Sequence, residues 1–167
     1  GERSVANSAA ILAWPASHGD WVRPGLMLYG ASPFPRGSGA DVGLRPVMTL
    51  QSEVIAVKTV EAGETVGYGG TWRAARRTSM AVVAVGYGDG YPRSARPGTP
   101  LLIDERRAPL IGRVSMDMIT ADVTGVPGVR VGASVELWGA LLPIEEVARA
   151  ADRIPYELTC GVTQRAP

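Results

Sequence analysis

The chain has 167 residues, of which 46% are hydrophobic and 20% are charged, and its net charge is +1. This composition is typical of a protein that folds around an apolar core, and it excludes a long disordered chain. The nearly balanced charge gives no indication of nucleic acid or of a charged membrane surface as a partner. No apolar run is long enough to span a bilayer.

Cysteine and histidine are too few for a disulfide framework or a metal site. The single cysteine, Cys160, cannot form an internal disulfide, so we expect a cytoplasmic protein. His18 is the only histidine, and no Cys/His spacing predicts a set of metal ligands. The chain begins in mid-pattern without an initiator methionine, and we expect a piece of a longer protein.

Residues 1–42 have a different pattern from the remainder of the chain. A short helix is predicted over residues 7–13, with Asn7 or Ser8 as the capping residue at its start. Residues 32–41 contain several prolines and glycines and are predicted to form a linker. The segment therefore has the pattern of the end of one structural unit followed by a connection.

From residue 44 onward the sequence predicts a mainly β body. The predicted strands are 48–56, 80–85, 100–103, 108–111, 114–118, 135–138 and 154–162. The apolar run at 80–85 is continuous, which predicts a strand buried on both faces, and one helix is predicted around 143–153. Because a closed sheet leaves no unpaired edge, we expect the strands to pack as a barrel.

Two short motifs near the N-terminus have both a binding and a structural interpretation. A serine hydroxyl at the start of a helix, as at Ser8, suits a phosphate group, but from this motif alone an ordinary helix cap is the favoured interpretation. Arg23 precedes Pro24 and Gly25, and glycine allows a ligand to approach the backbone closely. A surface arginine before a turn is the alternative for Arg23.

Tyr68 lies among three glycines, Gly67, Gly69 and Gly70. One interpretation is a tyrosine in an ordinary turn. The other is a phenol held at the rim of a site, where it could transfer a proton.

Two further loops carry polar and aromatic residues next to predicted strands. Tyr87 lies in a glycine-rich loop that follows the buried strand, and loops on rigid strands often carry function. Met116 and Asp117 are neighbours in a predicted strand, where alternate side chains face opposite ways, so both cannot lie in the core.

The order and spacing of these motifs are more specific than any one of them. The six motifs are Ala6–Ala10, Arg23–Gly30, Val66–Gly69, Val85–Tyr91, Gly112–Asp117 and Ile154–Glu157. Over essentially its whole length, the chain resembles the bacterial alanine racemases.

The resemblance implies a parent protein with two domains. Residues 1–42 would be the last part, with a linker, of a (β/α)₈ barrel that binds pyridoxal 5′-phosphate, and residues 43–167 would form the C-terminal β domain, similar to a β-barrel. The family forms a head-to-tail homodimer in which each site takes residues from both subunits.

The resemblance also assigns roles to single residues. The cofactor phosphate would be held by Ser8, Gly25, Leu26 and Tyr156. Arg23 would face the pyridine nitrogen, Tyr68 would be the base that acts on L-alanine in the partner's site, and the Met116 N–H would bind the substrate carboxylate. The corridor that leads to the site would be lined by Tyr87, Arg93, Arg113 and Ile154.

The implied reaction is the interconversion of L- and D-alanine, which supplies D-alanine for peptidoglycan. Two bases on opposite faces of Cα, a tyrosine and the cofactor lysine, would exchange the proton, while the cofactor delocalises the negative charge.

Two features depart from the family pattern. The cofactor lysine belongs upstream, and the only lysine here, Lys58, lies in a predicted strand of the β domain. We therefore expect this piece to be inactive alone. The family usually has a histidine three residues before Asn7, which helps to orient the arginine at the pyridine ring, and Ser4 occupies that place.

Two alternatives remain. A racemase of the same fold could act on serine or on a broader set of amino acids. A non-catalytic homologue or dimerisation module is the alternative from another class, and Ser4 is the feature that suggests it.

Overall fold

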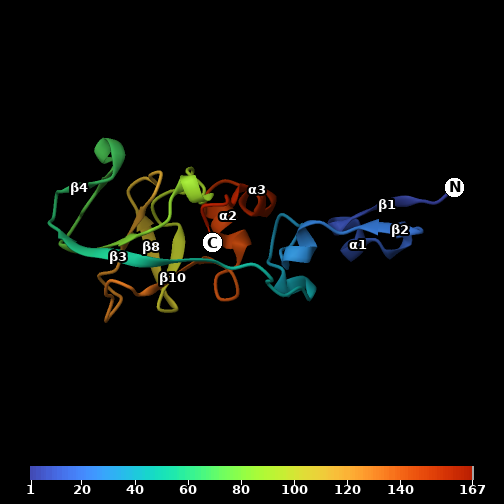
Figure 1. Cartoon of the computed structure of the whole chain (residues 1–167), viewed down its shortest axis with the longest axis horizontal. Coiled ribbons are helices and arrows are strands. Elements are labelled where there is room, and N and C mark those ends of the chain that lie inside the picture. The colour runs from blue at the N-terminus through green and yellow to red at the C-terminus, as the bar shows by residue number, and fades with distance from the viewer. Residues whose placement is uncertain (167) are drawn as a thin grey trace.

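The structure, a computed structural model, describes residues 1–166. The molecule is elongated, with a β body at one end and a narrow N-terminal arm at the other (Figure 1). The arm, residues 1–30, contains β1 (Ser4–Asn7), α1 (Ser8–Ala13), the 3₁₀ helix η1 (Pro15–Ser17), β2 (Trp21–Arg23) and the 3₁₀ helix η2 (Leu26–Tyr29). Within the described part of the chain, no helix is both long enough and apolar enough to cross a membrane.

The arm is built as a parallel strand pair with a helix in the connection. β1 pairs with β2 in parallel, and α1 lies between them in sequence. The Asn7 side chain accepts a hydrogen bond from the Ala10 N–H at 3.1 Å, so the predicted helix and cap are confirmed. The arm exposes large apolar side chains, among them Trp14, Trp21 and Leu28, which gives it an uncovered apolar surface.

The β body is a closed antiparallel barrel, which confirms the predicted fold class. Its strands in spatial order are β10 (Ser134–Trp138), β3 (Leu50–Val60), β6 (Thr78–Val83), β9 (Ile119–Asp122), β8 (Arg106–Ile111) and β7 (Pro100–Ile103). The pairing of β10 with β7 closes the sheet. Closure leaves no strand with unpaired backbone groups along a free edge.

The strand predicted at 80–85 corresponds to β6, which is buried on both faces but ends at Val83, and Ala84 beyond it is exposed. Ala81 and Val83 of β6 face the barrel core, whereas Met80 and Val82 belong to a second apolar cluster outside it. A hairpin of β4 (Thr65–Val66) and β5 (Trp72–Arg73) contributes to that second cluster. The continuous apolar run therefore reflects two separate packing surfaces.

The hairpin predicted at 100–111 is also confirmed. β7 and β8 pair through a turn at Asp104 and Glu105, whose φ angles are 44° and 64°. Left-handed conformations at both central residues are the geometry that matches the twist of a two-residue hairpin. The predicted helix is α2 (Ile144–Ala150), and Pro143 lies directly before its first residue.

A stacked pair of aromatic residues fills one part of the core. The Tyr91 and Trp138 rings lie 6.1 Å apart between centroids, with an angle of 15° between their planes. Both side chains are buried, and neither the Tyr91 hydroxyl nor the Trp138 Nε1–H has a hydrogen-bond partner among residues 1–166. Burial raises the pKa of the Tyr91 hydroxyl far above its ordinary value.

The strand predicted at 154–162 is wrong, because the segment forms α3 (Pro155–Gly161). Pro155 occupies the first helical turn, where its missing N–H costs no hydrogen bond, and Leu158 packs into the core. A proline inside a barrel strand would interrupt the ladder of backbone hydrogen bonds. Pro155 was therefore a signal in the sequence against a strand in this segment.

The strand predicted at 114–118 is wrong as well. The Ser115 N–H donates to the Met118 carbonyl, and the Ser115 hydroxyl also contacts the Met118 backbone. These local hydrogen bonds form a turn instead of an extended ladder. The strand β9 begins only at Ile119, and Met116 and Asp117 are both exposed.

The predicted linker is more ordered than its proline and glycine content suggested. It leads into a short 3₁₀ helix, η3 (Ala40–Val42), and Ser32 is buried near its start. Two of its backbone N–H groups, at Ser32 and Gly39, bind the Glu145 carboxylate. The connection between arm and β body is thus fixed by α2.

Candidate active site

Tyr68 lies at the rim of the β body on an exposed loop. It begins the 3₁₀ turn η4 (Tyr68–Gly70) between β4 and β5, and its side chain is 71% exposed. Its hydroxyl makes no hydrogen bond within residues 1–166, and it faces an open depression of about 520 Å³. The phenol is therefore available to a group from outside the chain. The exposed position fits a phenol at the rim of a site and excludes a tyrosine packed into the core of this chain.

The Tyr68 loop rests on Arg113. A Cβ atom at Gly67, whose φ is 79°, would lie 2.9 Å from the Arg113 backbone nitrogen, so only glycine permits this approach. The Arg113 guanidinium lies beside Gly69, and Arg113 lines the depression together with Tyr68. A second depression, of about 360 Å³, is lined by Arg93 together with Tyr68 and Arg113.

The Tyr87 and Met116 loops are joined through their backbones. Tyr87 begins the 3₁₀ turn η5 (Tyr87–Asp89), its N–H donates to the Ser115 carbonyl at 3.0 Å, and the Gly88 N–H donates to the Met116 carbonyl at 2.9 Å. Arg93 lies over the Tyr87 ring, 5.9 Å from its centroid. The Met116 N–H has no acceptor within the described part of the chain, which leaves it free to bind a ligand.

Three of the four residues assigned to the cofactor phosphate, Ser8, Gly25 and Leu26, lie together in the arm. The Ser8 Oγ accepts a hydrogen bond from the Gly25 N–H at 2.8 Å, which ties the start of α1 to the turn before η2. The Ser8 hydroxyl hydrogen and the Leu26 N–H have no acceptors among residues 1–166. Two donors are thus left in one small region, an arrangement that suits a phosphate oxygen.

Arg23 is held in place by residues of β1. Its Nη1 donates to the Ser4 hydroxyl at 2.9 Å and to the Ser4 carbonyl, and its Nη2 contacts the Val5 carbonyl at 3.4 Å. Ser4 therefore contacts the arginine from the position at which the resemblance implied a histidine. The permanent charge of Arg23 is fixed at the end of a parallel strand.

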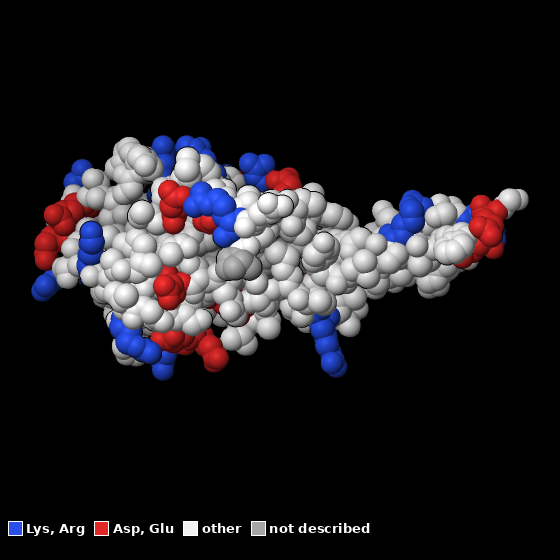
Figure 2. Space-filling model, viewed as in Figure 1, with Lys and Arg blue, Asp and Glu red and all other residues white. Residues whose placement is uncertain are grey.

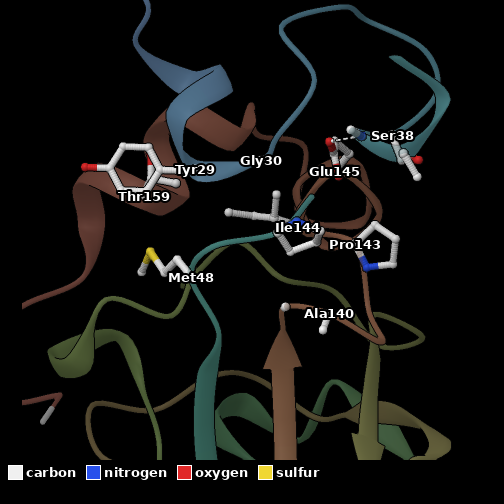
Figure 3. A pocket seen from close by; sticks show the side chains of 13 residues that line it. Tyr29, Gly30, Ser38, Met48, Ala140, Pro143, Ile144, Glu145 and Thr159 are labelled. Atoms are coloured by element: carbon white, nitrogen blue, oxygen red, sulfur yellow. Dashed lines mark hydrogen bonds between the residues drawn. The ribbon is translucent and has the colours of Figure 1, made fainter. Parts of the chain in front are cut away.

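Tyr156 and Ile154 lie at the start of α3, and both are exposed. Thr159 of α3 and Tyr29 of η2 line the same small cavity of about 90 Å³, so α3 lies beside the arm (Figure 3). The two residues are therefore on the helix of the β body that is packed next to the arm.

Glu145 is a residue that the sequence did not single out. It is only 4% exposed, and one carboxylate oxygen, Oε1, accepts hydrogen bonds from the Ser32 and Gly39 N–H groups at 2.7 and 2.8 Å. Figure 3 shows this carboxylate reaching the connection near Ser38. A glutamate in the first turn of a helix is common, so no sequence signal marked this contact.

The candidate residues form two groups and not a single site. The hairpin of β4 and β5, which carries Tyr68, lies at one end of the long axis, and β2, which carries Arg23, lies near the other (Figure 1). Figure 2 shows largely uncharged surface between the charged side chains of the β body and those near the tip of the arm. A single chain therefore does not bring Tyr68 to Arg23.

The chain thus combines a parallel βαβ unit with a closed antiparallel barrel that carries an exposed tyrosine loop at its rim. The model of the family "Alanine racemase, C-terminal domain" matches residues 47–167, and that of "Alanine racemase, N-terminal domain" matches residues 1–33. The chain belongs to the alanine racemase family, as the six motifs predicted.

Individual relatives agree with this assignment. The chain is 58% identical to the alanine racemase of Nitrosococcus oceani and 54% identical to that of Vibrio cholerae, over 99% of its own length and 46% of each relative. The biosynthetic alanine racemase of Pseudomonas aeruginosa matches its structure with a TM-score of 0.97, at 53% identity, over 99% of this chain and 46% of that chain. The alanine racemase of Bartonella henselae with covalently bound pyridoxal phosphate matches with a TM-score of 0.85, at 30% identity, over 98% of this chain and 45% of that chain. The chain thus spans less than half the length of these relatives.

Proposed function

We propose that the chain is the C-terminal part of a pyridoxal-phosphate-dependent alanine racemase that interconverts L- and D-alanine. In this proposal residues 1–42 complete a cofactor-binding barrel and residues 43–167 form the β domain. The supply of D-alanine for peptidoglycan would be its cellular role. A cytoplasmic location agrees with a single, exposed cysteine.

The observation that carries the proposal is the separation of Tyr68 from Ser8 and Arg23 along one elongated chain (Figure 1). Because the hairpin that carries Tyr68 lies far from β2 in one chain, its exposed phenol would reach the Arg23 site only on another molecule. A head-to-tail homodimer would supply that molecule, because each β body would then face the partner's arm.

The arm has donors that fit the cofactor. Ser8 and Leu26 would donate to the phosphate oxygens, with Gly25 and Tyr156 completing the phosphate site. Arg23, held by Ser4, would place its permanent charge at the pyridine nitrogen and keep that nitrogen unprotonated. When bound, pyridoxal phosphate supplies the group that delocalises negative charge from the substrate Cα.

The β body supplies the groups that act on the substrate. Racemisation removes a proton from one face of Cα and returns one to the opposite face, so it needs two groups that transfer protons. Tyr68 would accept or donate the proton on the L-alanine face, opposite the family's cofactor lysine. The free Met116 N–H would bind the substrate carboxylate, and the corridor would run past Tyr87, Arg93, Arg113 and Ile154.

The chain by itself should be inactive. Its only lysine, Lys58, is exposed on β3 of the barrel, away from the arm that carries Ser8 and Arg23. No group of the chain can therefore take the place of the cofactor lysine.

The proposal is tested with the full-length protein that contains this chain, loaded with pyridoxal phosphate in deuterated water. Loss of the Cα proton of L-alanine and appearance of D-alanine are followed by NMR, with L-serine as a comparison substrate. We expect the full-length protein to exchange the Cα proton of L-alanine, and we expect residues 1–167 alone to exchange none. A protein that binds the cofactor but exchanges no Cα proton would be a non-catalytic homologue, and exchange with serine alone would change the substrate.

A further inference from the structure

The C-terminal segment contacts both loops that the proposed function places at the substrate. The Thr163 N–H donates to the Asp89 carbonyl at 3.1 Å, and the Thr163 hydroxyl donates to the Gly88 carbonyl at 2.8 Å. A Cβ atom at Gly90 would lie 2.3 Å from the Gly161 carbonyl oxygen, so the two segments are in close backbone contact. The segment after α3 is therefore packed along the turn that begins at Tyr87.

Arg165 extends this contact from one loop to the other. Its Nε lies 3.2 Å from Asp89 Oδ1, and its Nη2 donates to Asp117 Oδ1. Asp89 lies between the proposed corridor residues Tyr87 and Arg93 in the chain, and Asp117 directly follows Met116. One guanidinium thus bridges carboxylates from both loops.

The Asp89 end of this bridge is mostly shielded from water. The Asp89 side chain is 14% exposed, and its other oxygen, Oδ2, accepts a hydrogen bond from the Gly86 N–H at 2.8 Å. Gly88 permits the approach of Arg165, because a Cβ atom there would lie 2.4 Å from Nη1. Asp89 therefore fixes the start of the Tyr87 turn while Arg165 fixes Asp89.

We infer that Arg165 is a positioning residue for substrate binding, acting through Asp89 and Asp117 on the loop that presents the Met116 N–H. This inference rests on the proposed function, which places that N–H at the substrate carboxylate. Arg165 does not itself line the depression beside Tyr68. Its loss should weaken binding of the alanine carboxylate while leaving proton transfer by Tyr68 intact.

The test compares Arg165→Gln with Arg165→Lys in the full-length, cofactor-loaded protein. We expect Arg165→Gln to raise KM for L-alanine about five- to tenfold with kcat little changed, since one charge-assisted contact to each loop is lost. Arg165→Lys should recover part of the effect by keeping one contact. Arg76→Gln is the matched control, because it removes the same charge from another exposed ion pair, with Asp122, and its KM should stay at the parent value.

Each other outcome has a defined meaning. An unchanged KM in an active Arg165→Gln protein would overturn the inference and leave the proposed function standing. Equal losses of kcat and Tm would also overturn it, because they indicate a merely structural role. A parent protein without Cα exchange refutes the proposed function instead. If Arg165→Gln does not fold, Asp117→Asn weakens the same bridge from its exposed side and must raise KM in the same way.

Discussion

The Ser4 hydroxyl accepts a hydrogen bond from the Arg23 guanidinium, with 2.9 Å between Oγ and Nη1. The resemblance to the family led us to expect a histidine at position 4, and the Ser4 hydroxyl supplies an acceptor for Arg23 there. The Ser4 and Val5 carbonyls add two further contacts to the same guanidinium.

Ser4→Ala should therefore have a limited effect on cofactor binding. It removes one of three acceptors, and the loss of one hydrogen bond to a charged group costs about 1.5 kcal/mol, or roughly tenfold in affinity. Arg23→Ala removes the charge itself and should weaken binding much more. Titration of the full-length protein with pyridoxal phosphate measures both, and an equal loss in the two variants would show that Ser4 alone holds Arg23.

Tyr68→Phe should lower racemisation by about 10²–10⁴-fold, the range expected for loss of one acid–base group. Its stability should stay unchanged, because the hydroxyl makes no hydrogen bond within residues 1–166 and the side chain is exposed. The rate of D-alanine formation and the thermal unfolding midpoint check the two parts. An unchanged rate would remove Tyr68 from its proposed role.

The same variant tests whether each site takes residues from two subunits. Tyr68→Phe and Arg23→Ala proteins, each weakly active, are unfolded together and refolded to form mixed dimers. If Tyr68 of one subunit serves the site that contains Arg23 of the other, mixed dimers contain one intact site and activity returns. No recovery would place both residues in a site of one subunit.

Gly86→Ala should destabilise the protein by about 1–3 kcal/mol, as an added methyl group does in a packed region. A Cβ atom at Gly86 would lie 2.2 Å from the Met116 carbonyl oxygen, and backbone atoms cannot move aside as a flexible side chain can. Gly125→Ala is the control, since a Cβ atom there meets nothing within 4 Å. Urea unfolding compares the two, and equal midpoints would contradict the close contact of the two loops.

Glu145→Ala should loosen the connection between the arm and the β body. It leaves the buried Ser32 and Gly39 N–H groups without an acceptor, at a cost of about 1–3 kcal/mol for each group. Glu145→Gln keeps an oxygen acceptor of the same shape and should cost less. Limited proteolysis within residues 32–41 is the measurement, and an alanine variant that is cleaved no faster than the parent would contradict the expected loosening.

Tyr91→Phe should stabilise the protein by about 1 kcal/mol at neutral pH, because the buried hydroxyl has no partner among residues 1–166. Since burial raises the pKa of Tyr91 in the folded state, the folded protein binds more protons than the unfolded one above the ordinary tyrosine pKa of about 10. Stability should therefore fall with rising pH, by about 1.4 kcal/mol per pH unit. The Tyr91→Phe variant should not show the part of this decline that comes from ionisation of Tyr91.

Denaturant unfolding at several pH values between neutral and strongly alkaline conditions measures this effect. Tyr29→Phe, at an exposed ring, is the control and should change stability by less than about 0.5 kcal/mol. If the free energy of unfolding falls equally steeply with rising pH in the Tyr91→Phe variant and in the parent, the Tyr91 hydroxyl is solvated.

Much of the fold could be predicted because its signals are local. The capped helix after Asn7, the doubly buried strand that begins the 80–85 run and the hairpin at 100–111 depend on neighbouring residues. The structure contains all three, although the strand ends at Val83. The helix at 155–161 and the turn at 115–118 were predicted as strands, because apolar residues at short spacing suit either structure. Pro155 has no N–H for a strand ladder and suits the start of a helix. Ser115 closes the turn by donating its hydroxyl hydrogen to the Met118 carbonyl.

By itself, the sequence determined the family, through the order of six short motifs, and with it the residues that are candidates for the site. Only the tertiary structure decided how those residues are grouped. Ser8 lies with Gly25, Tyr68 lies with Arg113, and the two groups are far apart along the long axis of the molecule. It also decided the contacts of Glu145 and Arg165, whose partners lie far away in sequence. The reason is that local patterns fix backbone conformation, whereas contacts between distant segments depend on how the closed barrel and the arm pack together.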